Sequence, residues 1–112
     1  MIQRSWRARA SADRAHLYAE HLTQTVLPKL EQLDGFRGLV LSRRRDGDAV
    51  ELVVQTYWAS MRAVEQFAGP SPEVAVVEPA AAAVLLSFDP TVQHHEVLLR
   101  TSSELGYRSS TS

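Results

Sequence analysis

The sequence predicts an α+β domain of ferredoxin-like type, in which a four-stranded antiparallel sheet carries helices on one face. Three observations lead to this prediction. Residues 2–10 alternate in kind with a period of two, as a strand does. A long amphipathic stretch follows, with apolar residues three or four apart. A hairpin, a shorter helix and a last strand complete the order βαββαβ.

The first strand is predicted over Ile2–Ala10, and Ser11 is predicted to cap the long helix that follows it. Gly35 lies just beyond the expected end of this helix, where a glycine commonly terminates one. Pro28 lacks a backbone donor inside the helix, so we expect a kink or a break near Thr25–Leu27. The apolar positions of the helix are Ala15, Tyr18, Leu22, Val26, Leu30 and Leu33.

A hairpin is predicted around Asp46–Gly47, two residue types that suit the positive φ angles of a tight turn. Its second strand, Val50–Trp58, is apolar on both parities, which favours cover on both faces. Helices can cover one face. We expect a second copy of the chain to cover the other, because soluble monomers seldom expose a large apolar patch.

Ser60 is predicted to cap a short helix that ends at Gly69–Pro70. The alanine-rich stretch after it predicts two further helical turns, the second opened by Pro79. Thr91–Arg100 is then predicted as the fourth strand. We assign one domain to residues 1–100 and expect the polar residues 101–112 to form a mobile tail.

Composition is typical of a globular protein, with 45% apolar residues, 22% charged residues and a net charge of −1. Nothing in it indicates a nucleic-acid partner or a membrane, since there is no apolar run of about 18 residues. The chain has no cysteine, which excludes thiolate catalysis and fits the cytoplasm. Residues 1–45 hold nine Lys/Arg and four Asp/Glu, whereas residues 46–112 hold three and nine. We expect these halves to pair within the fold or across a dimer.

Several phrases of the sequence resemble the antibiotic biosynthesis monooxygenase family, whose members are dimeric α+β barrels. The phrases are RSWRARA, LP before GFRG, RRRDGDAVELVVQTYW, WASMRAVEQFAG and VVEPAAAAVLLSFDPTVQHHEV. The resemblance implies a homodimer paired through its sheet faces, with a pocket between sheet and helices in each subunit. It also implies oxygenation of an aromatic or polyketide-like molecule without a cofactor. The alternative is a non-enzymatic ligand-binding or accessory dimer on the same scaffold.

A haem-degrading branch of this family uses an Asn, a Trp and a His together. The position of that Trp resembles Phe67 here, and the region of the His reads PEVAVVEP, with no histidine. The resemblance therefore implies no haem, and we expect no cofactor and no metal. His16 and His21 are five residues apart on the first helix, which does not suit a helical metal pair.

Cofactor-free oxygenation requires a dry cavity, a base for a phenolic proton and donors that stabilise the resulting anion. His94 is the candidate catalytic base, because histidine titrates near neutrality; the alternative is a histidine that only packs and hydrogen-bonds. His95 has the opposite parity and is expected on the other face of the sheet. Arg4 and Tyr57 are further polar candidates. The residues expected to shape the substrate cavity are Trp6, Tyr18, Trp58 and Phe67.

Overall fold

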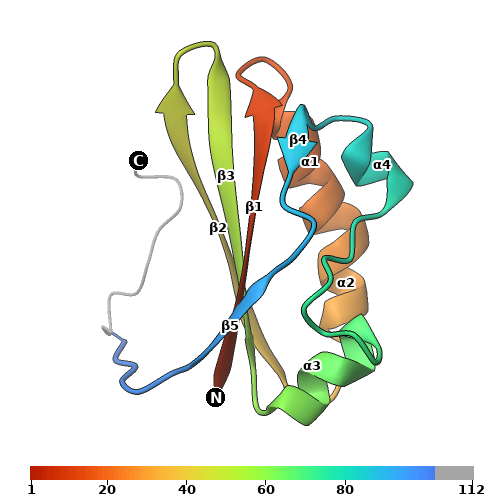
Figure 1. The fold of residues 1–112 in the computed structure, drawn as a ribbon, viewed down its shortest axis with the longest axis vertical. Helices are drawn as coiled ribbons and strands as arrows, with labels where there is room; N and C mark the ends of the chain where they lie inside the picture. Colours follow the sequence, from red (N-terminus) through yellow and green to blue (C-terminus); the bar gives the residue numbers. More distant parts are fainter. Residues whose placement is uncertain (103–112) are drawn as a thin grey trace.

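The computed structural model describes residues 1–102, which form one sheet with helices on one face (Figure 1). Within these residues no helix has the length and apolar character needed to span a membrane. The predicted mobile tail falls outside the described residues from position 103 onward. The elements in chain order are β1 (Ile2–Ser11), α1 (Ala15–His21), a π-helical segment (Leu22–Val26), α2 (Leu27–Leu30), β2 (Phe36–Asp46), β3 (Ala49–Trp58), α3 (Met61–Ala68), α4 (Pro79–Ala82), β4 (Ser87–Phe88) and β5 (Gln93–Glu96).

The sheet is antiparallel, and its order β2-β3-β1 is followed by both β4 and β5, each of which pairs with β1. This order confirms the predicted α+β, ferredoxin-like fold. The number of strands was predicted wrongly, because two short strands share the fourth position in place of one strand over Thr91–Arg100. Pro90 lies between the two strands and has no N–H to donate to β1. The carbonyl oxygen of Asp89 accepts from Trp6 Nε1 at 2.7 Å, and the chain bends at Pro90, which interrupts the strand.

The first helix begins later than predicted. Ser11 is the last residue of β1 and pairs with Ala49, and no side chain caps α1. The predicted break near Thr25–Leu27 is confirmed, since a π-helical segment ends at Val26 and the N–H of Leu27 reaches back five residues to Leu22 O. Pro28 explains it, because its ring cannot occupy a regular α-helical interior and it has no hydrogen to donate.

The hairpin and the short helix agree with the prediction. Asp46 pairs with Ala49, and Gly47 has φ of 64° in the two-residue loop between them. Ser60 caps α3, with its hydroxyl oxygen accepting from Ala63 N. Of the two further helical turns, α4 forms and is opened by its proline, whereas the first is a single turn closed by Val74 N and Ser71 O.

The core lies between the sheet and the helices. The even-numbered residues of β3 are all buried there, from Val50 to Trp58, while the odd-numbered ones are half-buried on the opposite face. We call that opposite face the outer face. It carries polar side chains such as Glu51 and Gln55 beside Val53 and Tyr57, so a single chain covers one face of the sheet and leaves a mixed surface on the other.

The uneven distribution of charge is resolved inside the fold. Each ion pair of the described residues joins a residue before position 46 to one at or after it. Arg9 meets Asp46 at 3.0 Å, and Lys29 meets Glu78 at 3.1 Å. The prediction that the two halves of the chain pair is therefore confirmed within one subunit.

Candidate functional site

A cavity of about 70 Å³ lies between the sheet and the helices. Its walls come from the three long strands, from the π-helical segment and α2, from α3, and from the irregular segment before α4. The lining is apolar except for Arg4 and Thr56. Val76 also lines it and is 49% exposed, so the cavity reaches the surface beside this residue.

Arg4 places a cation in this apolar space, where it is only 5% exposed. Its Nη1 donates to Pro72 O and lies 3.0 Å from His94 Nε2, and its Nη2 donates to Val74 O at 3.1 Å. The guanidinium also lies over the ring of Phe67, 5.7 Å from its centroid. Burial lowers the pKa of Arg4 to about 10, a value at which it is still charged near neutrality.

The acceptors around Arg4 are neutral. Within residues 1–102 no carboxylate oxygen lies within 4.0 Å of its guanidinium. Two backbone carbonyls and an imidazole nitrogen take the place of a counterion. Because Coulomb attraction is stronger in an apolar interior of low dielectric constant than in water, the buried charge of Arg4 can attract a ligand anion to the cavity.

His94 lies opposite Arg4 in the register of β5 and β1. Since a guanidinium only donates, His94 Nε2 accepts this hydrogen bond, and the hydrogen of the neutral ring is on Nδ1. Burial and the charge of Arg4 lower the pKa of His94, with Glu73 acting in the opposite direction and His95 adding a smaller lowering. His94 does not itself line the cavity; Arg4 connects the two.

The four aromatic residues expected to shape the cavity divide into two pairs. Trp6 and Phe67 line it. Tyr18 packs behind Trp6, with 6.1 Å between ring centroids, and Trp58 stacks on Phe67 at 5.6 Å. Trp58 is fully buried and its Nε1 donates to Thr56 Oγ1 at 2.9 Å, so it supports the wall and does not face the space.

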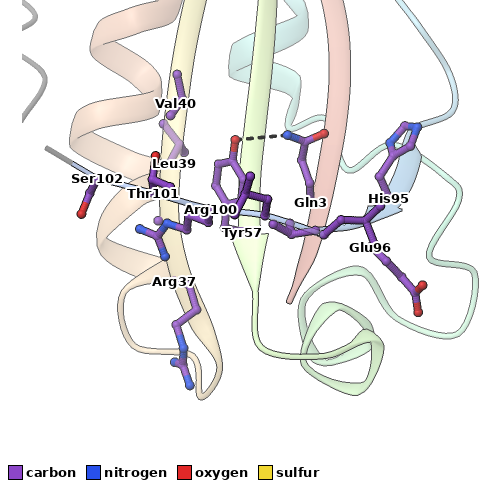
Figure 2. Close-up of a pocket in the computed structure, with 14 residues that line it drawn as sticks. Gln3, Arg37, Leu39, Val40, Tyr57, His95, Glu96, Arg100, Thr101 and Ser102 are labelled. Atoms are coloured by element: carbon purple, nitrogen blue, oxygen red, sulfur yellow. Dashed lines mark hydrogen bonds between the residues drawn. The ribbon is translucent and has the colours of Figure 1, made fainter.

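The outer face carries a larger hollow, a groove of about 790 Å³ (Figure 2). His95 lines this groove, together with Gln3 and Tyr57, whose side chains share a hydrogen bond of 3.1 Å. Residues 97–102 form one wall. The two neighbouring histidines of β5 therefore lie in different environments, with His94 beside Arg4 and His95 in the groove.

The remaining histidines lie on the first helix. His16 is exposed, and His21 Nε2 lies 3.3 Å from Glu78 Oε1. Lys29 and His21 lower the pKa of Glu78. In the part of the chain that the structure describes, no cluster of three metal-ligating side chains occurs.

The cavity does not fit a haem. None of its lining residues is a histidine, a cysteine, a methionine or a tyrosine, which are the usual axial ligands of haem iron. Phe67 stands over Arg4 as part of the wall, and no step that involves haem is derived for this chain.

Sequence reasoning named Arg4 as a candidate without a role and missed Thr56. Both have the parity of buried residues, Arg4 in β1 and Thr56 in β3, and they are direct partners in the β1–β3 register. A polar residue on the apolar parity of a strand was the available signal for each of them. Their adjacency depends on strand pairing, which is not visible in either segment alone.

The chain matches no protein-family model and no curated protein, whereas solved structures share its fold. A Bacillus cereus protein assigned as an antibiotic biosynthesis monooxygenase has a TM-score of 0.63 and 14% identity, with 91% of this chain and 97% of that chain covered. The haem degrader MhuD from Mycobacterium tuberculosis has a TM-score of 0.56 and 23% identity, with 91% and 100% covered. A Streptomyces coelicolor monooxygenase from the gene ActVA-Orf6, in complex with nanaomycin D, has a TM-score of 0.57 and 15% identity. The match covers 89% of this chain and 92% of that chain.

Proposed function

We propose that the chain, which has the fold of antibiotic biosynthesis monooxygenases as the resemblance in its sequence predicted, is a cofactor-independent monooxygenase. It would act on an aromatic or polyketide-like molecule bound between the sheet and the helices. The observation that carries this proposal is the Arg4–His94 pair beside an otherwise apolar cavity walled by Trp6 and Phe67. The pair combines a cationic donor with a titratable acceptor, which are the groups that such a reaction requires.

In the proposed reaction, His94 Nε2 accepts the first proton and the electron-rich ring of the substrate then reduces O₂. One oxygen atom becomes a carbonyl oxygen on a ring CH₂ carbon, and the other leaves as water with the two hydrogens of that carbon. A neutral imidazole has one lone pair, and Arg4 occupies that of His94. Because His94 also does not line the cavity, proton transfer requires both that Arg4 finds another acceptor when the substrate binds and that His94 Nε2 comes within hydrogen-bond reach of the substrate.

The segment between α3 and α4 must give way for a substrate to enter, because the cavity of about 70 Å³ is smaller than an aromatic substrate needs. This segment has no regular structure from Ala75 to Glu78 and holds Val76 at the rim. Arg4 fastens its start through Pro72 O and Val74 O. In this proposal the segment moves when the substrate binds and enlarges the cavity, and the sheet keeps its structure.

The second candidate function is a non-enzymatic ligand-binding or accessory dimer. The small volume of the cavity and the occupied lone pair of His94 favour it. In this case the Arg4–His94 pair is structural, and it holds the segment after α3 against β1. The same cavity then binds a ligand without altering it.

Turnover separates the two functions. Dioxygen uptake with an anthrone-type substrate, which carries a ring CH₂ between two arenes, is expected for the wild type and lost by at least ~100-fold in His94→Ala. The matched control is His16→Ala, because His16 is exposed on α1 and should leave uptake unchanged. Binding without uptake in the wild type would favour the accessory function, and equal uptake by His94→Ala would remove His94 from the mechanism.

A homodimer through the outer face belongs to the same proposal, with the cytoplasm as its compartment. Leu98 and Leu99, which are 94% and 84% exposed, follow β5 at the edge of the groove on this face. Val40 on β2 adds a third exposed apolar side chain. A second copy of the chain would cover these side chains, which a soluble monomer gains nothing from exposing.

A further inference from the structure

Two polar side chains are buried within residues 1–102, and they lie side by side. Arg4 is 5% exposed and Thr56 is 7% exposed. They are direct partners across β1 and β3, and both line the cavity. Every other residue of the lining is apolar or aromatic. Two buried polar side chains at one point of an otherwise apolar wall mark the place where a polar group of a ligand can bind.

The hydroxyl group of Thr56 can donate a hydrogen bond to a ligand in the cavity. Its Oγ1 accepts from Trp58 Nε1 at 2.9 Å, and this bond orients the hydroxyl so that its hydrogen is donated elsewhere. Arg4 contributes a buried positive charge that only neutral acceptors surround. Arg4 and Thr56 are opposite each other on adjacent strands and both line the cavity, so a cationic donor and a hydroxyl donor are available to a carboxylate bound there.

We propose that Arg4 and Thr56 bind the carboxylate of an aromatic acid whose ring occupies the apolar part of the cavity. This inference rests on the proposed function for its site and names the class of substrate. One cation and one hydroxyl suit a monoanion better than a phosphate, which carries more charge and more acceptor oxygens. Trp6 and Phe67 supply the aromatic walls for the ring.

The carboxylate also explains how His94 becomes a base. In the free protein the lone pair of Nε2 accepts from Arg4. A bound carboxylate is a stronger acceptor for a guanidinium than a neutral imidazole is. Arg4 therefore exchanges His94 for the ligand, and the Nε2 lone pair is released. A substrate that lacks the acid group leaves His94 engaged.

A binding experiment with paired probes tests this site without any need for turnover. Benzoate and benzamide have nearly the same size and shape, and they differ in charge. Binding is followed by NMR at the indole N–H signals of the chain's two tryptophans, because Trp6 lines the cavity and Trp58 donates to Thr56. We expect benzoate to bind ~10–100-fold more tightly than benzamide, and to raise the pKa of His94 when benzamide does not.

Variants assign the effect to the two residues. Arg4→Met is expected to abolish the preference for benzoate, and Arg4→Lys, which keeps the charge and the link to the backbone, to retain part of it. Thr56→Val should weaken benzoate binding and Thr56→Ser should restore it. Arg7→Met is the matched control, because Arg7 is exposed on the same strand with the opposite parity.

The outcomes are distinguishable. Preference for benzoate that disappears in Arg4→Met, with Arg4→Lys folded and Arg7→Met unchanged, supports the carboxylate site. Equal binding of benzoate and benzamide overturns it and leaves the aromatic cavity of the proposed function in place. Absence of binding by either probe overturns both the carboxylate site and the cavity on which the proposed function depends.

Discussion

A guanidinium on the helix side of a sheet must find its acceptors in the protein, because water no longer reaches it. Arg4 finds them in Pro72 O, Val74 O and His94 Nε2. At the scale of the residue, one side chain thus joins β1 to the turn after α3 and to β5. It is both a structural tie and the polar centre of the cavity.

The pKa of His94 predicts a pH dependence of stability. Burial and Arg4 lower this pKa below the ordinary 6.5, so the unfolded chain binds a proton more readily than the folded one. The contribution of His94 is fully present above pH 6.5 and is lost as pH falls through the folded-state pKa. Urea unfolding measures the free energy of unfolding between pH 7.5 and 5. This free energy should fall more steeply with decreasing pH for the wild type than for His94→Gln, whose side-chain carbonyl is still expected to accept from Arg4. Parallel curves would contradict the prediction.

Gly35 has a steric role that Gly47 lacks. A Cβ at Gly35 would lie 2.6 Å from the Cβ of Ala63, and its φ is 86°, whereas a Cβ at Gly47 would meet open space at φ of 64°. Gly35→Ala should therefore lower the free energy of unfolding by roughly 2–4 kcal/mol, and Gly47→Ala by about 1 kcal/mol. Chemical denaturation of both variants measures the difference, and similar losses would show that Ala63 moves aside.

At the scale of the element, the two helix starts differ in kind. Ser60 caps α3 through a hydrogen bond to Ala63 N, whereas Ser11 ends β1 and the turn at Arg14 separates it from α1. Because the backbone of Ser11 pairs with Ala49 in the sheet, Ser11 belongs to β1, and the helix begins after the turn. A serine before an amphipathic stretch therefore had two uses in this chain, and local sequence did not distinguish them.

The difference is measurable. Ser60→Ala should cost about 1 kcal/mol of stability, since it leaves the N–H of Ala63 without its acceptor. Ser11→Ala is the control and should change stability by less than about 0.5 kcal/mol. Thermal or urea unfolding compares the two, and an equal loss in both variants would mean that Ser11 supports α1 after all.

At the scale of the whole molecule, the helices cover one face of the sheet (Figure 1), and the segment of residues 97–102 lines the groove on the other face. The outer face is mixed in character, and its most exposed apolar side chains are on that segment. We expect the chain to have the mass of a dimer by light scattering at micromolar concentration. The double variant Leu98→Asp with Leu99→Asp should shift it toward the monomer, because charge in an apolar interface is costly to bury.

Leu86→Asp is the control for the dimer, since Leu86 is 64% exposed just before β4 and away from the groove. It should leave the mass unchanged. A wild type that is monomeric at this concentration would contradict the pairing of sheet faces. It would leave the cavity and its binding experiments unaffected, because the described cavity is formed within one chain.

The sequence by itself determined the fold class, the hairpin at Gly47, the capped helix at Ser60 and the break before Pro28, because each depends on local periodicity or on the backbone chemistry of one residue type. It also separated His94 from His95, since neighbouring strand residues face opposite sides.

Tertiary structure alone decided the rest. The contact of Arg4 with His94 joins residues 90 positions apart, and the pairing of Arg4 with Thr56 depends on the register of β1 and β3. The split of the fourth strand and the small volume of the cavity follow from how the segment after α3 packs. Such features arise from long-range pairing, which no pattern within one segment encodes.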